Sequence, residues 1–303
     1  MPRRFSLKYT LLASSFALAL GAPTAIADSA TTAPLEQFAV HAETSTYNVR
    51  YDPIADFMGA FTDVERGRVK ISYAAVEQQG QRFLTQYTRY LRNVPVSSLS
   101  RDDQLAYWLN TRNMLVVKAM AESNSRRRLE RARGTADAPG EMWTEKLITI
   151  QGVELSIDDI ERNIILANWS DTPNVIYGLY QGSKGGAGFP EEAYTGETVH
   201  TALAEQGADF VNSRSGLRVR RSKAQVPAIY DWYGEALFDG DQEAVRAHLA
   251  SLAKPSTAEK LAEATTFETR KFSYSSDELV IRQQASPGAG AFSGGGGGGG
   301  VGS

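Results

Sequence analysis

The stretch that decides the fold runs from Trp143 to Pro190. It begins with WTEKLITIQGVELSIDDIER (143–162) and, after a short connection, ends with DTPNVIYGLYQGSKGGAGFP (171–190). Apolar residues alternate on both sides of Gln151-Gly152, which predicts two short strands joined by a two-residue turn. The run from Ser156 to Asp159 fits a capping box that opens a helix. The stretch therefore predicts a hairpin, then a helix, and later a glycine-rich loop.

The rest of the chain adds mainly helices, as judged by the spacing of apolar residues. Helices are predicted over Tyr73–Leu91, Arg101–Ser123 (opened by a second capping box at Ser100–Asp103), Thr198–Asn212, Val226–Phe238 and Glu243–Leu252. Short strands are predicted over Val175–Leu179 and Leu217–Arg221, while Tyr51–Phe61 fits either a helix or extended chain. The pattern predicts a single α+β domain over residues 50–284, mainly helical with a small β-sheet.

Both ends of the chain differ in composition from this domain. Residues 1–27 have a basic start, an apolar stretch from Tyr9 to Gly21, and small residues before a cleavage site after Ala27. This is typical of a signal peptide, and the stretch is shorter than the roughly 20 apolar residues of a membrane span. Residues 28–49 are predicted to be a flexible or loosely docked lead-in, and the glycine-rich residues 285–303 a disordered tail. We expect the mature protein to be exported, to the periplasm or the extracellular space.

Charge and cysteine content exclude several classes of protein. Cleavage after Ala27 removes three cations and no acid, so the formal net charge falls from −3 to −6. That mild acidity argues against nucleic acid or an anionic membrane as the default partner. No later segment is apolar enough to predict a transmembrane span. The chain has no cysteine, which excludes disulfides, thiolate metal sites and thiol nucleophiles.

Four motifs follow one another between residues 83 and 238. They are YWLNTRN (107–113), LSIDDIE (155–161), the loop Tyr177–Pro190, and IYDWY (229–233). In this order and spacing they resemble the bacterial DUF547 family, a domain of unknown function. Members of that family usually carry an Asn-Cys-Gly triplet in the loop, one histidine after the Ile-Glu pair and another shortly before the cysteine.

The chain departs from this family pattern where chemistry would take place. Tyr180, Gln181 and Gly182 stand at the positions of the triplet, and Arg162 and Ile176 stand where the histidines are expected. A Cys–His pair in such a loop would imply amide cleavage or acyl transfer of the papain or transglutaminase kind, in which a thiolate attacks a carbonyl. The resemblance therefore implies a divergent member that lacks the reactive pair.

Polar residues within the motifs are candidates for ligand contacts. Asn110 and Asn113 lie on one face of a helix, where their amides could orient a ligand or bond to the backbone of a loop. Asp158, Asp159 and Glu161 could bind Ca²⁺ or act as an acid/base pair, but acids are also expected in the first turn of a helix. The spacing of these acids is not that of an EF-hand, which favours helix capping.

The loop itself offers few reactive groups. It lacks the residue order of a P-loop, so neither a nucleotide nor another cofactor is predicted. Ser183 is a weak candidate for a nucleophile, with Lys184 or Glu161 as its base. The three histidines, His41, His200 and His248, lie in separate segments, so no metal site is predicted.

Two further clusters allow competing interpretations. The cations Arg126–Arg128, Arg131 and Arg133 could meet a polyanion, or they could form a solvated helix end. Tyr230, Trp232 and Tyr233 could line an aromatic groove, or they could pack in the core.

These observations favour a non-catalytic binding or scaffold protein of the cell envelope, which holds a peptide or another envelope ligand. The predicted ligand contacts are Trp108, Asn110, Asn113, Gln181, Ser183 and Trp232. The alternative is an amide hydrolase or acyl transferase with a replaced nucleophile, for which Ser183 and Glu161 are the weak catalytic candidates.

Overall fold

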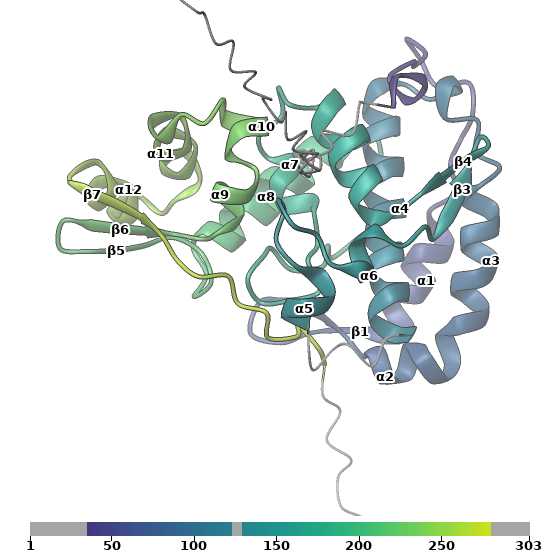
Figure 1. Cartoon of the computed structure of the whole chain (residues 1–303), viewed down its shortest axis with the longest axis horizontal. Coiled ribbons are helices and arrows are strands. Elements are labelled where there is room, and N and C mark those ends of the chain that lie inside the picture. The colour runs from purple at the N-terminus through teal and green to yellow at the C-terminus, as the bar shows by residue number, and fades with distance from the viewer. Residues whose placement is uncertain (1–34, 123–128, 280–303) are drawn as a thin grey trace, which may run out of the picture. The chain divides into compact units, whose positions relative to one another are not determined.

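The computed structural model describes residues 35–122 and 129–279. These residues form a single α+β domain that is mainly helical, as predicted (Figure 1). The predicted signal peptide, residues 28–34 of the lead-in, Arg126–Arg128 and the glycine-rich tail lie outside the described residues. No helix within the described ranges is both long and apolar enough to cross a lipid bilayer.

Helices dominate the first half of the domain, with short 3₁₀ turns (η1, η3) and one π-helical turn (η2) between them. The elements are η1 (Glu36–Phe38), α1 (Asp52–Phe61), β1 (Thr62–Val64), β2 (Val69–Ile71), α2 (Tyr73–Ala75), η2 (Val76–Gly80), α3 (Gln81–Leu91), η3 (Val96–Ser98), α4 (Arg101–Glu122), α5 (Leu129–Arg133) and α6 (Glu141–Thr144).

The second half contains more strands and a π-helical segment, η5. Its elements are β3 (Ile148–Ile150), β4 (Val153–Leu155), η5 (Asp159–Leu166), α7 (Val175–Gly178), α8 (Val199–Val211), β5 (Arg218–Arg220), β6 (Lys223–Val226), α9 (Ile229–Trp232), α10 (Gly234–Phe238), α11 (Gln242–Leu252), α12 (Pro255–Ala262) and β7 (Thr266–Thr269).

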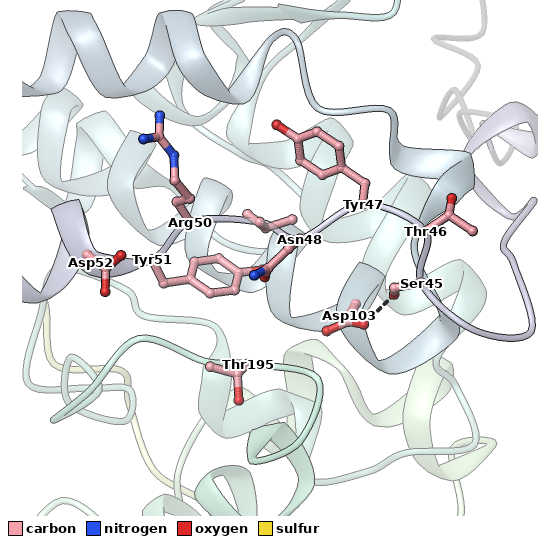
Figure 2. A pocket seen from close by; sticks show the side chains of 10 residues that line it. Ser45, Thr46, Tyr47, Asn48, Arg50, Tyr51, Asp52, Asp103 and Thr195 are labelled. Atoms are coloured by element: carbon pink, nitrogen blue, oxygen red, sulfur yellow. Dashed lines mark hydrogen bonds between the residues drawn. The ribbon is translucent and has the colours of Figure 1, made fainter.

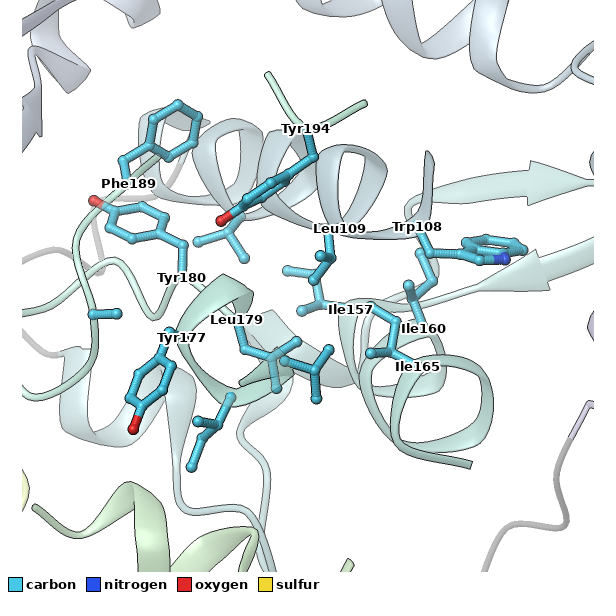
Figure 3. Packing of buried hydrophobic residues seen from close by; sticks show 14 of the residues in the cluster. Trp108, Leu109, Ile157, Ile160, Ile165, Tyr177, Leu179, Tyr180, Phe189 and Tyr194 are labelled. Carbon is cyan, nitrogen blue, oxygen red and sulfur yellow. The ribbon is translucent and has the colours of Figure 1, made fainter. Parts of the chain in front are cut away.

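Helix α4 lies at the centre of the core. Every residue from Gln104 to Val117 is buried, because the helix is apolar over most of its circumference and packs against α3, η5 and α8. Figure 3 shows Leu109 of α4 among residues of the segment that leads into η5 and of the loop that follows α7. The motifs at residues 107–113, 155–161 and 177–190 thus meet in one packed region.

The described residues contain three small sheets rather than the one that was predicted. β1–β2 and β3–β4 are antiparallel pairs, and β6 pairs antiparallel with β5 and parallel with β7. The turn between β3 and β4 is confirmed: Gln151 and Gly152 have φ values of 49° and 83°. Positive φ at both positions is the geometry of a two-residue hairpin turn, which a glycine favours.

Two predicted elements are wrong. Val175–Leu179 was predicted as a strand, but Val175–Gly178 is the helical turn α7, which begins with hydrogen bonds from Val175 and Tyr177 to the carbonyls of Thr172 and Asn174. A run of four or five apolar residues fits a buried helix as well as a strand. Val226–Phe238 was predicted as one helix, but it starts in β6 and then divides into α9 and α10.

Residues 35–49, which the composition assigns to the lead-in, pack against the domain. Phe38 is fully buried, with its ring edge-on to Trp108 at a centroid distance of 5.0 Å. The Ser100 amide donates to the Ser45 hydroxyl at 2.7 Å, so Ser45 takes the place that the capping box gives to the Asp103 carboxylate. The second hydrogen bond of the capping box does form, since the Asp103 amide donates to the Ser100 hydroxyl at 3.3 Å. The packed domain therefore begins before residue 50.

Replacement of glycine by alanine is expected to have opposite effects on stability at two positions. A Cβ at Gly207 of α8 would lie 2.5 Å from a ring carbon of Tyr177, whereas a Cβ at Gly59 of α1 would meet nothing within 4 Å. We expect Gly207→Ala to lower the free energy of unfolding by about 1–3 kcal/mol through overpacking. Gly59→Ala should raise it by about 0.5–1 kcal/mol through helix propensity. Urea denaturation of both variants measures the contrast, and equal shifts would contradict the close packing of α7 on α8.

Candidate functional site

The segment η5 carries Glu161 into the centre of the domain. The preceding capping box forms in full, because the Ser156 amide donates to Asp159 Oδ2 at 2.7 Å and the Asp159 amide to Ser156 Oγ at 3.1 Å. Asp158 pairs instead with Arg162 at 3.2 Å. Asp158 and Asp159 are therefore engaged at the start of η5, as the capping interpretation predicts, and only Glu161 points into the core.

Glu161 is buried and paired with two arginines. Arg112 Nη2 donates to Glu161 Oε2 at 2.5 Å, and Arg133 Nη2 lies 3.8 Å from Oε1. Tyr233 donates its hydroxyl to Oε1 at 2.5 Å, and the indole nitrogen of Trp143 lies 3.5 Å from Oε2. A buried carboxylate costs several kcal/mol unless its charge is balanced, and here cations from α4 and α5 provide that balance.

Gln181 extends this network to the loop. Its carbonyl oxygen accepts two hydrogen bonds from Arg133, at 2.7 and 3.0 Å. Its amide nitrogen donates to the Leu179 carbonyl at 2.9 Å and to the Tyr233 hydroxyl at 3.1 Å. Arg133 also lies over the ring of Trp232, 4.4 Å from its centroid. The side chain at the loop position is thus bonded through both its oxygen and its nitrogen.

The two asparagines of α4 hold loop backbone. Asn110 exchanges two hydrogen bonds with the backbone of Tyr194, at 2.8 and 3.1 Å. Asn113 donates to the Gly178 carbonyl at 2.9 Å and accepts from the Tyr180 amide at 3.2 Å. Both residues therefore clamp the segments on either side of the loop, which was the alternative to ligand orientation.

Electrostatics keep Glu161 charged. Burial alone would raise the pKa of this carboxyl, but the charges of Arg112 and Arg133 and the Tyr233 hydrogen bond hold that pKa below its usual value. Burial, with the adjacent Glu161 charge, raises the pKa of Tyr233. A carboxylate with a lowered pKa and occupied oxygens is a poor proton acceptor at neutral pH. The network stabilises structure and offers no general base.

Ser183 lies outside this network, under the last described segment of the chain. Residues 275–277 run antiparallel to the loop: the Lys184 amide donates to the Ser275 carbonyl at 2.9 Å, and the Asp277 amide to the Gly182 carbonyl at 3.1 Å. Ser183 is fully buried and its hydroxyl has no hydrogen-bond partner among the described residues. Lys184 is exposed, so the pair proposed as nucleophile and base does not come together.

The glycines of the loop permit close packing. A Cβ at Gly185 would lie 2.6 Å from the ring of Phe272, and one at Gly186 would lie 2.7 Å from the side chain of Gln181. Arg68 ties the loop down by donating to the carbonyls of Ser183 and Gly186, at 3.0 and 2.9 Å. The glycine pattern is therefore explained by contacts within the domain, without a bound phosphate.

The environment of Ser183 indicates how its replacement by alanine should change the free energy of unfolding. A buried hydroxyl without a partner costs roughly 1–3 kcal/mol of desolvation. We therefore expect Ser183→Ala to leave the free energy of unfolding unchanged or to raise it by about 1 kcal/mol. The measurement is urea denaturation followed by circular dichroism. A loss of more than about 1 kcal/mol would indicate that the hydroxyl makes a hydrogen bond that stabilises the fold.

A comparison with protein families finds a match for part of the chain. Residues 96–211 match the family model described as "Protein of unknown function, DUF547". This part of the chain is therefore similar to the DUF547 family. The matched range includes Arg112, Glu161 and Gln181, but the DUF547 match ends before Tyr233 and before the segment that covers Ser183. No curated protein and no solved structure matches the chain.

Most of the residues predicted to contact a ligand are inaccessible. Five of the six are buried, namely Trp108, Asn110, Asn113, Gln181 and Ser183. Trp232 is partly exposed, and its ring lies against Phe272 at a centroid distance of 4.2 Å. The side chains that were predicted to line a cleft around the loop are thus packed against other residues of the chain.

The sequence interpretation missed the cations that organise the network. Arg133 was grouped with a solvated helix end, but it is 1% exposed. Arg112 stands within an otherwise buried, largely apolar helix face, and Tyr233 was assigned only to the core or a groove. A charged residue at an apolar helix position rarely stays buried without a partner, and that signal could have linked Arg112 to Glu161.

A separate open pocket lies at the start of α4. It has a volume of about 600 Å³ and is lined by Ser45, Thr46, Tyr47, Asn48, Val49, Arg50, Tyr51, Asp52, Asp103 and Thr195. Figure 2 shows the rings of Tyr47 and Tyr51 on either side of Asn48, with Asp103 held by Ser45. Residues of the predicted lead-in thus supply half of the residues that line this open, polar pocket. No group of three His, Asp or Glu residues that could hold a metal ion occurs in the described ranges.

Proposed function

We propose that this chain is an exported, non-catalytic binding or scaffold protein of the cell envelope, built on a DUF547 domain. One observation carries the proposal. Gln181 stands where the family resemblance places a cysteine, and both ends of its amide are bonded to Arg133, Tyr233 and Leu179 within a buried network. Such a position supplies neither a nucleophile nor a free polar group for substrate. Export rests on the signal-peptide pattern of residues 1–27.

The ligand class that we favour is a peptide or another envelope component, held outside the loop. The pocket lined by residues 45–52, Asp103 and Thr195 supports this, because it is open to solvent and presents tyrosine rings beside amide, hydroxyl and carboxylate groups. Ligand pockets commonly combine apolar ring surface with a few polar groups that fix orientation. Asp103, in the first turn of α4, is held in place by hydrogen bonds from the hydroxyls of Ser45 and Ser100.

Labelling of the purified mature protein tests the non-catalytic proposal. We expect no reaction with a broad serine-hydrolase probe, because Ser183 is buried and lacks a base. Labelling that Ser183→Ala abolishes would establish a replaced nucleophile and would overturn the proposal, provided that the variant keeps its unfolding midpoint.

A thiol probe then tests whether the loop position of Gln181, where the family resemblance places a cysteine, is accessible. We expect Gln181→Cys to react more slowly than Thr46→Cys, because residue 181 is 1% exposed while Thr46 is at the surface. Faster reaction at residue 181 than at residue 46 would indicate an accessible, activated site. It would favour the hydrolase or transferase alternative.

A further inference from the structure

A second pocket, of about 530 Å³, has a lining with four cations and no acid. It lies between the end of α8, strand β5 and helix α12. The cationic lining residues are Arg214, Arg218, Arg220 and Lys260. The other lining residues are neutral: Asn212, Ser213, Leu217, Val219 and Thr257. The pocket therefore carries a formal charge of about +4 at neutral pH.

Local structure places these cations on one site. Arg218 and Arg220 alternate with Val219 along β5 and are exposed, so both side chains leave the same face of the strand. Thr257 and Lys260 are three residues apart on α12, which also places them on one face. Arg218 is held in position by hydrogen bonds to the Arg214 carbonyl, at 3.2 and 2.6 Å.

The positive charge of the pocket is not balanced within the described part of the chain. None of the four cations forms an ion pair there, although Lys223 on the neighbouring strand pairs with Glu268. A fifth cation, Arg270, bonds to the carbonyls of Ser215 and Gly216 in the turn before β5. Burial lowers the pKa of Arg270, and the charge of Arg218 lowers it further. Like charges therefore repel one another at this site, and a bound anion would relieve that repulsion.

We propose that this pocket binds a phosphate ester. Guanidinium groups bind phosphate oxygens in a bidentate manner, and Arg218 and Arg220 present two such groups from one strand. The pocket is larger than a phosphate ion, and Leu217 and Val219 give apolar surface for an organic group attached to it. The site shares no residue with the Glu161–Gln181 network or with the pocket at residues 45–52, so it goes beyond the proposed function. It also differs from the predicted polyanion surface at Arg126–Arg133, since Arg133 is buried.

A phosphate ester can be a soluble molecule or a lipid headgroup, and two measurements separate these sources. Isothermal titration of the mature protein with glycerol phosphate at low ionic strength reports a soluble ester. Co-sedimentation with phosphatidylcholine vesicles, with and without phosphatidylglycerol, reports a headgroup. We expect binding in at least one measurement, and we expect added salt to weaken it.

Matched double variants test whether the pocket is responsible. R218Q/R220Q should weaken binding by about tenfold or more, because each charge-assisted hydrogen bond to phosphate contributes more than 1 kcal/mol. R82Q/R89Q removes the same charge from exposed positions of α3 and should leave binding within about twofold. The proposal is overturned if neither probe binds, or if both double variants weaken binding equally while keeping the native unfolding midpoint.

Discussion

Glu161→Gln should lower the free energy of unfolding by about 3–5 kcal/mol, which is the typical cost of removing one partner from a buried ion pair. The variant is close in size to the native residue, so packing changes little. It leaves Arg112, which is fully buried, and Arg133, which is 1% exposed, facing a neutral amide. Urea denaturation followed by circular dichroism measures the loss.

An exposed glutamate on the β3–β4 hairpin supplies the control. Glu154 makes no ion pair among the described residues, so Glu154→Gln should change stability by no more than about 0.5 kcal/mol. If Glu161→Gln is no less stable than Glu154→Gln, the charge of the Glu161 carboxylate does not stabilise the buried network. A double variant, Arg112→Met with Glu161→Leu, should be less destabilised than the sum of its single variants, because two opposite charges leave the core together.

The parts of the fold that the sequence could predict depend on local chemistry. The β3–β4 hairpin follows from alternation and from Gln151-Gly152, and the start of η5 follows from the Ser156–Asp159 capping box. The ends of α8 and α11 agree with prediction within one residue. Turn geometry and helix capping involve residues two to four positions apart, so a single sequence contains them.

The parts that were missed depend on contacts between distant segments. Nothing near Val175 in the sequence indicates that Gly178 will pack against Leu109 and Leu203 and favour a helical turn there. Arg133 and Gln181 are 48 residues apart, and Tyr233 lies a further 52 residues along the chain. A buried polar network needs the three-dimensional fold before any member can be recognised as buried. The loop was therefore interpreted as a ligand cleft when it is a packed part of the core.

Acidification should destabilise the protein through His248. Its Nε2 lies 2.8 Å from the Tyr177 hydroxyl and its ring stacks on Tyr177, while Phe238 and Tyr230 pack nearby. Burial lowers the pKa of His248 to about 4, below the ordinary value of about 6.5. The folded state therefore binds this proton less readily than the unfolded state. Its stabilising contribution is complete above pH 6.5 and is lost as the pH falls towards 4. Between pH 8 and pH 5 we expect a loss of about 2 kcal/mol from this residue.

A comparison of the native protein with His248→Gln separates the effect of His248 on stability from the opposing effect of Asp158. Burial, and then the charge of Glu161, raise the pKa of Asp158 to about 6, so the folded state binds that proton more readily and gains stability as the pH falls through the same range. Glu161 does not add to the change in stability between pH 8 and pH 5, because its lowered pKa places its protonation at more acidic pH. The stability difference between the native protein and His248→Gln should therefore shrink by about 2 kcal/mol from pH 8 to pH 5. Parallel curves for His248→Gln and the native protein would place the histidine in solvent rather than against Tyr177, and the packing of α11 on α7 and α8 would need revision.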